Sequence, residues 1–222
     1  MARKGKYMIF DPNSKRKNVI CLGAHSDDIE LGCGGALLRM SKENQLKNVK
    51  FVVMTGDQVR VQEAKNSLHY FSNMASDVSW KIDFGDFPDG RLPYHGVSVR
   101  NWLDKLLDNE KPDLIFTHQR DDAHQDHRFI SNLTYNIFRN DFILEYEILK
   151  TDIDQGQPNF FIGFDKEVMN IKSKLILESF VSQNKKKWFN ARNIESLAAV
   201  RSVHANNKYE YSEGFYCRKF IW

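Results

Sequence analysis

The chain has 222 residues, of which 41% are hydrophobic and 27% are charged, so it is long enough to bury one sizeable core. Its formal net charge of +3 is too small to indicate a nucleic-acid-binding protein, and no segment approaches the roughly 18 consecutive apolar residues of a membrane span. The three cysteines, Cys21, Cys33 and Cys217, form no CxxC pair and favour a reducing, cytoplasmic setting over a disulfide scaffold.

Short β-branched runs alternate with longer amphipathic runs along the first two thirds of the chain. In chain order they predict strand 19–24, helix 35–44, strand 49–55, helix 60–75, strand 78–84, helix 97–110 and strand 112–118. The less regular last third predicts strands 142–149, 159–164 and 215–222 and helices 166–180 and 189–205. This alternation indicates an α/β, Rossmann-like fold, with a mostly parallel sheet and helices on both faces. No repeat or linker divides the chain, so we expect a single domain over residues 1–222.

Two clusters of histidine and acidic residues follow predicted strands. The first cluster comes after strand 19–24 and contains His25, Asp27, Asp28 and Glu30. The second cluster comes at the end of strand 112–118 and contains His118, Asp121, Asp122, His124, Asp126 and His127. Because ligands of open α/β sheets bind beyond the carboxyl ends of the strands, we expect the two clusters to meet at one edge of the sheet.

A divalent cation explains why so many carboxylates lie together, because its charge converts their repulsion into shared coordination and keeps them ionised. Two imidazoles and one carboxylate, with a position left for water, are typical of a catalytic zinc site. A lone histidine at a strand end is usually a hydrogen-bonded core residue, and a lone pair of aspartates is usually a turn or a helix cap. Two dense clusters at strand ends are harder to explain in that way, and they favour a metal site.

The stretches that hold these clusters resemble the signatures of a known family. "GAHSDDIELGCGGALL" (23–38) is similar to the AHPDDxE signature, and "THQRDDAHQDHR" (117–128) to the second signature, of the PIG-L/LmbE-like zinc-dependent N-acetyl-sugar deacetylases. "VRVQEA" (59–64) and "FPDGRL" (87–92) match weaker family segments. The resemblance implies a Rossmann-like fold, a Zn²⁺ cofactor or another divalent transition metal, and hydrolysis of an N-acyl group, usually N-acetyl, on a small amino sugar or sugar conjugate.

The resemblance also implies a role for each matching position. His25, Asp28 and His127 are expected to bind the metal. Asp27 is expected to be the general base that takes a proton from the attacking water. His124 is expected to be the second acid/base or the group that stabilises the oxyanion.

Three further expectations and one departure come from the same comparison of motifs. Asp126 is expected to orient the imidazole of the second acid/base, and Arg60 and Asp89 fall where relatives contact the sugar. The chain departs from the pattern at Ser26, where proline is usual, which removes a backbone restriction but no metal ligand.

Several alternatives stay open at this stage. The chain could be another single-metal hydrolase, acting on the N-acyl amide of a non-sugar metabolite or on a phosphodiester, or a non-catalytic binding module. The lysines of "NKKKW" (184–188) are expected to be solvated helix surface, and the tryptophans to serve the core or an interface. The glycines around Cys33 predict a tight turn into a helix, whose free N–H groups could hold an anionic substrate group. We place the specificity loops near 86–96 and 150–160; relatives are often multimeric, so a homo-oligomer is compatible with the resemblance.

Overall fold

The computed structural model describes residues 16–151, 155–206 and 208–219, and these contain one seven-stranded sheet with the order β3-β2-β1-β4-β5-β7-β6. The strands are β1 (Lys17–Gly23), β2 (Leu46–Thr55), β3 (Ser79–Phe87), β4 (Leu114–His118), β5 (Ile143–Tyr146), β6 (Phe160–Phe164) and β7 (Tyr211–Tyr216). Strands β1 to β5 pair in parallel, and β7 is antiparallel to both β5 and β6. The expected α/β fold with a mostly parallel sheet is confirmed.

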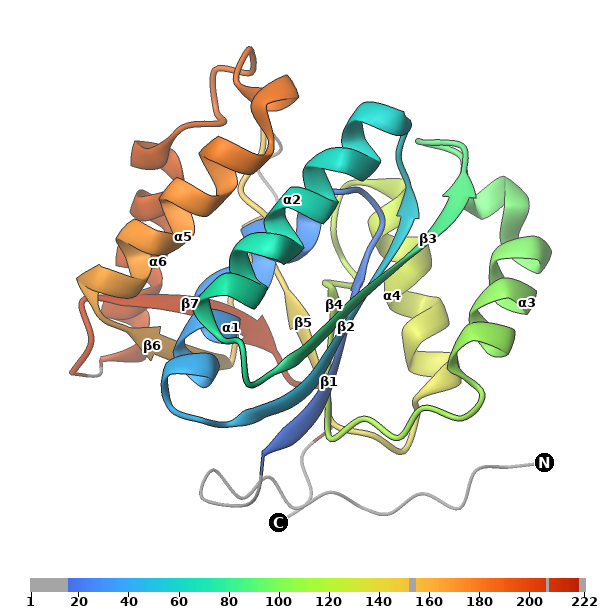
Figure 1. Cartoon of the computed structure of the whole chain (residues 1–222), viewed down its shortest axis with the longest axis horizontal. Helices are drawn as coiled ribbons and strands as arrows, with labels where there is room; N and C mark the ends of the chain where they lie inside the picture. The colour runs from blue at the N-terminus through green and yellow to red at the C-terminus, as the bar shows by residue number, and fades with distance from the viewer. Residues whose placement is uncertain (1–15, 152–154, 207, 220–222) are drawn as a thin grey trace.

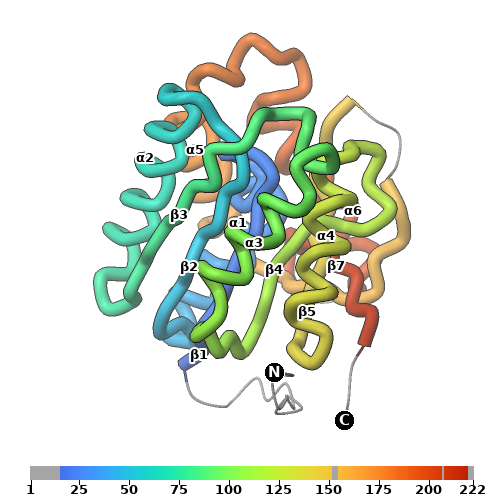
Figure 2. The backbone as a smooth tube through the Cα atoms, turned by 90° about the vertical axis from the view of Figure 1, so that its right-hand side faces the viewer, coloured from blue at the N-terminus to red at the C-terminus, as the bar shows by residue number. Residues whose placement is uncertain are grey.

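Helices cover both faces of this sheet (Figure 1). They are α1 (Asp28–Lys42), α2 (Gln58–Met74), α3 (Gly96–Leu107), α4 (Gln125–Ile137), α5 (Lys166–Ser179) and α6 (Ala191–Ala205), with short 3₁₀ helices η1 (Leu92–His95) and η2 (Val181–Gln183). Helices α1, α2, α5 and α6 lie on one side, and Figure 2 shows α3 and α4 in front of the other side. None of the helices in the described ranges is long and apolar enough to cross a membrane.

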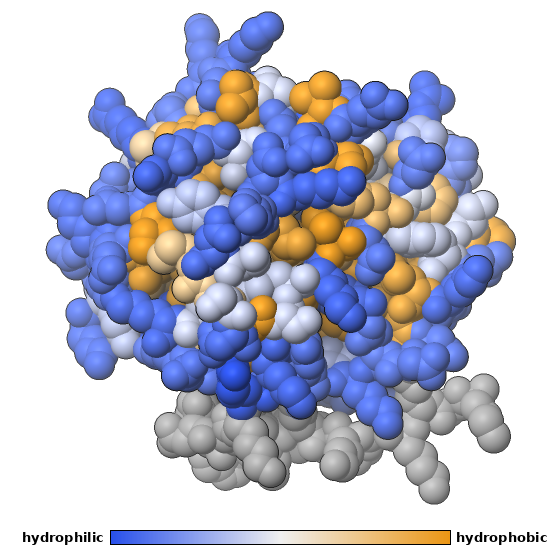
Figure 3. Space-filling model, in the orientation of Figure 1, coloured by the Kyte–Doolittle hydropathy of each residue, from blue (hydrophilic) through white to orange (hydrophobic). Residues whose placement is uncertain are grey.

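The sheet separates two hydrophobic clusters because successive side chains of a strand point to opposite faces. In β1, Val19 and Cys21 join the cluster beneath α1, α2, α5 and α6, whereas Ile20 and Leu22 join the cluster beneath α3 and α4. Continuous apolar strands therefore arise from burial on both faces. Figure 3 shows hydrophilic residues over much of the outer surface, with hydrophobic residues between them.

The element boundaries differ from the sequence prediction most clearly at three places. Helix α4 lies between β4 and β5, where no element was predicted, because polar residues precede it and Asp126 and His127 occupy the first turn of an otherwise amphipathic segment. Helix α1 begins at Asp28 rather than at residue 35. The last strand spans Tyr211–Tyr216 instead of 215–222, and residues 220–222 of that prediction lie outside the described ranges.

The early start of α1 follows from close packing of its glycines against neighbouring strands. A Cβ atom added to Gly32 would lie 2.2 Å from the Tyr146 ring, and one on Gly35 would lie 2.5 Å from the Phe164 ring. These glycines therefore stand inside the helix and allow it to approach the sheet, instead of forming the predicted turn. The helix is nevertheless irregular at Cys33, where φ is −141°.

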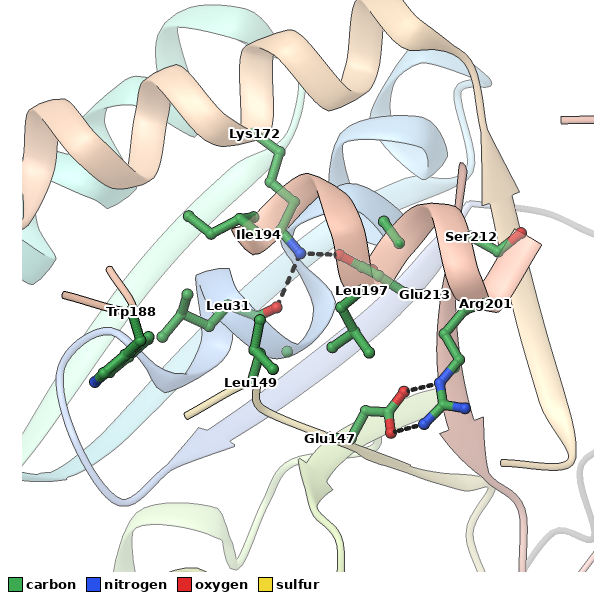
Figure 4. A pocket seen from close by; sticks show the side chains of 13 residues that line it. Leu31, Glu147, Leu149, Lys172, Trp188, Ile194, Leu197, Arg201, Ser212 and Glu213 are labelled. Atoms are coloured by element: carbon green, nitrogen blue, oxygen red, sulfur yellow. Dashed lines mark hydrogen bonds and ion pairs between the residues drawn. The ribbon is translucent and has the colours of Figure 1, made fainter. Parts of the chain in front are cut away.

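The irregularity at Cys33 leaves backbone N–H groups free, and the protein satisfies them itself. Gly35 and Ala36 donate their N–H groups to the Glu213 carboxylate over 2.7 and 2.8 Å. Lys172 Nζ donates to the same carboxylate over 2.6 Å and to the carbonyl of Leu31 over 2.8 Å (Figure 4). The expectation that a substrate anion binds here is therefore wrong, because an internal carboxylate already occupies these donors.

Candidate active site

The two histidine and aspartate clusters meet between β1 and β4. At this point of the sheet the strand order changes direction, since β2 and β3 follow on one side of β1 and β5 follows on the other side of β4. Strands β1 and β4 are neighbours in the sheet, and the chain leaves β1 toward α1 on one face and β4 toward α4 on the other. This divergence opens a crevice at the carboxyl ends of the two strands, as expected at a topological switch point. A cleft of about 850 Å³ lies there, and its walls include the histidines at positions 25, 124 and 127 and the aspartates at positions 27, 28 and 89.

The three residues expected to bind a metal bring their ligand atoms together at the base of this cleft. His25 Nδ1 lies 3.1 Å from His127 Nε2 and 3.2 Å from Asp28 Oδ2, and the latter two atoms are 3.5 Å apart. Ligand atoms held about 2.0–2.2 Å from a tetrahedral zinc ion are separated by roughly 3.3–3.6 Å. The sides of the observed triangle lie in this range or about 0.1–0.2 Å below it, so the triangle is close to the size that one such cation requires.

The charge of Asp28 fits the same arrangement. Its carboxylate is buried, and its Oδ2 atom also accepts the backbone N–H of His25 over 2.6 Å. Burial alone would raise the pKa of Asp28, but the nearby imidazoles of His127, His25 and His118 lower that pKa well below its usual value. The carboxylate is therefore held in the ionised form that binds a cation.

His127 is oriented by a carboxylate behind it. Its Nδ1 lies 2.9 Å from Asp122 Oδ2, and the other carboxylate oxygen accepts the backbone N–H of His124 over 2.7 Å and pairs with Lys150. Burial would raise the pKa of Asp122, but its contacts with His127 and Lys150 lower it. A carboxylate on the outer nitrogen of a metal-binding histidine is a common support in metal sites, because it fixes the tautomer and the direction of the ring. The sequence placed Asp122 in the cluster without giving it this role.

His25 has carboxylates beyond its outer nitrogen as well. Its Nε2 lies 2.9 Å from Asp89 Oδ1 and 3.7 Å from Asp126 Oδ2. The Asp126 carboxylate is fully buried and accepts the backbone N–H groups of Gly90 and Leu92 over 2.8 and 3.1 Å. Asp126 thus ties the 87–92 loop to α4, and Asp89 on that loop contacts the His25 ring.

His118 also lies close to the ligand triangle. Its Nε2 is 3.2 Å from Asp28 Oδ2 but accepts the backbone N–H of Ala24 over 2.9 Å, and the side chain is fully buried. The arrangement therefore also contains the group Asp28, His118 and His127 as a possible donor set. His25 fits a hydrolytic site better, because it lines the open cleft while the Nε2 lone pair of His118 already accepts a hydrogen bond.

Asp27 faces the cleft from the position before α1 and forms an ion pair with Arg60 Nη2 over 2.6 Å. Burial raises the pKa of Asp27, the Arg60 charge opposes this shift, and the neighbouring Asp28 adds to it. Arg60 Nη1 contacts Glu63 Oε2 over 2.9 Å, and Glu63 in turn accepts the backbone N–H of Ser182 over 2.7 Å. Arg60, which the resemblance placed beside the sugar, thus connects Asp27 to the segment after α5.

His124 stands at the N-terminal end of α4, with its ring 4.8 Å from the His25 ring and 4.6 Å from the His127 ring between centroids. Its Nδ1 accepts the backbone N–H of Asp126 over 3.2 Å. Asp126 therefore contacts His124 through its backbone, while its carboxylate is used elsewhere. Because Nδ1 is an acceptor, the proton of the neutral ring lies on Nε2. Burial lowers the pKa of His124, and the charges of His127 and His25 lower it further.

Other cleft residues were not expected from the sequence. Trp188 and Leu31 line both this cleft and a second, smaller cavity beside Lys172 and Arg201, which Figure 4 shows. Lys186 also lines the cleft, so the predicted helix surface at 184–188 is a loop at an opening instead. Only spatial proximity identifies these residues, because a tryptophan and a lysine in a polar loop carry no motif.

Comparison with known proteins places the chain in a family. Residues 20–138, more than half of the chain, match PIG-L, described as GlcNAc-PI de-N-acetylase. The chain belongs to the PIG-L family. This match includes both His/Asp clusters and confirms the family that the sequence motifs indicated.

One sequence relative of this PIG-L chain is named a deacetylase, and proteins that share its fold are named for different activities. It is 27% identical over 172 residues to "Uncharacterized deacetylase YaiS" of Escherichia coli (strain K12), covering 72% of this chain and 88% of that protein. The structure of N,N'-diacetylchitobiose deacetylase from Pyrococcus horikoshii is similar with a TM-score of 0.69 and 23% identity, covering 93% of this chain and 86% of that one. GalB, the 4-carboxy-2-hydroxymuconate hydratase of Pseudomonas putida KT2440, is similar with a TM-score of 0.70 and 13% identity, covering 93% and 98%. The fold is therefore shared with a hydratase, so the fold alone does not determine the reaction, which depends on the side chains of the site.

Proposed function

We propose that this chain is a metal-dependent N-deacetylase that hydrolyses the N-acetyl group of an amino sugar or sugar conjugate. The observation that carries the proposal is the triangle of His25 Nδ1, Asp28 Oδ2 and His127 Nε2, with sides of 3.1, 3.2 and 3.5 Å. Membership of the PIG-L family and the deacetylase activity named for two relatives support it.

In this proposal the three side chains of the triangle hold one divalent cation, and the two-imidazole, one-carboxylate donor set suits Zn²⁺. When bound, such a cation supplies a Lewis acid that lowers the pKa of water and polarises an amide carbonyl. Asp122 orients the His127 ring through a hydrogen bond with its outer nitrogen, and the Asp89 carboxylate lies 2.9 Å from the outer nitrogen of His25.

Asp27 acts as the general base. It takes a proton from water while the water oxygen forms a bond to the carbonyl carbon of the N-acetyl group. The raised pKa that burial gives to Asp27 strengthens it as a base, and the ion pair with Arg60 holds its carboxylate in place. Arg60 is therefore proposed to position the base; a direct contact with the sugar is secondary.

His124 acts on the other side of the reacting carbonyl. Its Nε2–H donates a hydrogen bond to the oxygen on which negative charge develops. When the C–N bond breaks, the amine nitrogen receives the proton that Asp27 took from water, because an unprotonated amine is a poor leaving group, and the neutral His124 ring keeps its Nε2–H. Asp126 supports this arrangement by fixing His124 through its backbone N–H and the 87–92 loop through its carboxylate.

The experiment is an assay of amine release by the purified protein with added Zn²⁺. The substrates are N-acetylglucosamine, N,N'-diacetylchitobiose, an N-acetyl amino acid and a nitrophenyl phosphodiester. We expect the acetylated sugars to release amine and acetate, with activity lost on chelation and restored by Zn²⁺. His127→Ala should abolish the activity, whereas His69→Ala, which removes an exposed histidine of α2, should retain it.

Two outcomes would overturn this proposal. Hydrolysis of the phosphodiester or the N-acetyl amino acid alone would assign the site to another class of hydrolase. Sugar deacetylation that survives both chelation and His127→Ala would show that the triangle is not the reacting centre.

A further inference from the structure

The cleft is larger than its reacting end, and both acidic and basic side chains line it. At about 850 Å³ it lies in the upper part of the 300–1,000 Å³ range of ligand pockets, so it has space beyond a single acetylated sugar ring. Its acidic lining residues are the carboxylates of the reacting end together with Asp57 and Asp89. Its basic lining residues are Arg60, Lys150 and Lys186, and Trp188 lies on the same loop as Lys186.

The loop that carries Lys186 is fixed by hydrogen bonds on both sides of this residue. Ser182 donates its backbone N–H and its hydroxyl to Glu63 over 2.7 and 2.8 Å. Lys186 donates its N–H to the Gln183 carbonyl over 2.9 Å and accepts the N–H of the buried Phe189 over 3.0 Å. Lys186 is therefore presented from a defined backbone, and the Glu63 anchor is the same residue that contacts Arg60.

The three lysines of this loop face solvent. Lys185, Lys186 and Lys187 are exposed, and within the described ranges none of them pairs with a carboxylate. Lys186 Nζ lies 5.7 Å from the centroid of the Trp188 ring, so a cation and an aromatic face stand together at the cleft. The other two cations that line the cleft differ, because Asp122 pairs with Lys150 and Asp27 pairs with Arg60.

We propose that this loop, residues 185–188, binds an anionic group of the substrate, with Lys186 as the main contact and Trp188 as an apolar platform beside it. The inference rests on the proposed deacetylase function and specifies its substrate class: an acetylated amino sugar that carries a phosphate or a carboxylate. The carboxylates at the reacting end repel this anionic group and the lysines attract it, so the charge difference orients the conjugate with its N-acetyl group toward His25 and His127.

The test compares kcat/KM for N-acetylglucosamine 1-phosphate, N-acetylmuramic acid and the neutral methyl N-acetylglucosaminide. We expect the wild type to prefer at least one anionic substrate over the neutral one, and the two anionic arms distinguish phosphate from carboxylate. Lys186→Glu should reduce the ratio of anionic to neutral kcat/KM by about 5- to 10-fold, mainly through KM, because it replaces an attraction with a repulsion at a partly screened site. Lys186→Gln should give a smaller reduction.

The matched control is Lys105→Glu on α3, which makes the same charge change at an exposed position on the other face of the sheet and should leave the ratio unchanged. Calorimetric titration of the wild type and Lys186→Glu with N-acetylglucosamine 1-phosphate measures binding without turnover.

Chelator-sensitive hydrolysis of the neutral glycoside without an anionic preference would reject the lysine contact and leave the deacetylase proposal standing. The lysine contact would also be overturned if Lys186→Glu left the ratio of anionic to neutral kcat/KM unchanged, or if the wild type did not bind the phosphorylated sugar. If no sugar is hydrolysed but the phosphorylated sugar binds and Lys186→Glu weakens that binding, the anion site stands and the reaction is what fails.

Discussion

Replacing Asp122 by asparagine tests how the proposed metal ligand His127 is held. The Asp122 carboxylate accepts from three donors: the His127 ring nitrogen, the backbone N–H of His124 and the Lys150 ammonium. An asparagine side chain offers one oxygen and one NH₂ group, so at least one of these donors must face another donor. The substitution preserves shape and removes both the charge and part of the hydrogen bonding.

The expected cost follows from this geometry. Loss of a carboxylate that supports a ligating histidine typically lowers metal affinity or activity by about 10- to 100-fold, which is about 1.4–2.7 kcal/mol. We expect Asp122→Asn to weaken zinc binding by this factor, measured by competition with a chromogenic chelator. The variant should regain much of its activity at saturating Zn²⁺.

The control for this experiment is Asp121→Asn, at the neighbouring exposed aspartate, which should bind zinc as the wild type does. Equal zinc affinity of Asp122→Asn and the wild type, with one ion bound to each, would refute the reasoning. It would mean that the orientation of His127 does not depend on this carboxylate.

Three further predictions concern catalysis and packing. Asp27→Asn should reduce kcat by about 10²- to 10⁴-fold while the protein still binds zinc, and unchanged turnover would exclude it as the base. Gly32→Ala should lower the free energy of unfolding by about 1–3 kcal/mol, because the new methyl group meets a tyrosine ring of β5 at 2.2 Å. Gly34→Ala on the same helix, with its nearest neighbour at 3.8 Å, should not lower that energy in the same urea titration. Lys172→Met should cost about 3–5 kcal/mol because it leaves a buried carboxylate without its cation, whereas Lys42→Met, in an exposed pair, should cause no measurable change.

Only some of the residues that line the cleft were predictable from the sequence. Lys150 and Thr151, which follow β5, and the 87–89 turn line the cleft, within the ranges expected to set specificity. The segment at 184–188 was expected to be helix surface, because a run of lysines usually faces solvent. Its place at the cleft depends on hydrogen bonds that Ser182 donates to Glu63, more than a hundred residues earlier in the chain, which no local pattern reveals.

The sequence by itself determined the sheet, the family and the cluster of candidate ligands, because strand burial, βα alternation and the two His/Asp motifs are all local patterns. The carboxyl ends of parallel strands share one edge, so the meeting of the two motifs also followed from the fold class. Tertiary structure alone decided which carboxylate supports which imidazole, that Asp126 binds backbone amides of the 87–92 loop, and that Glu213 occupies the helix donors near Cys33. These pairings join segments distant in sequence, and such contacts are fixed only when the packed elements bring their atoms within hydrogen-bonding distance.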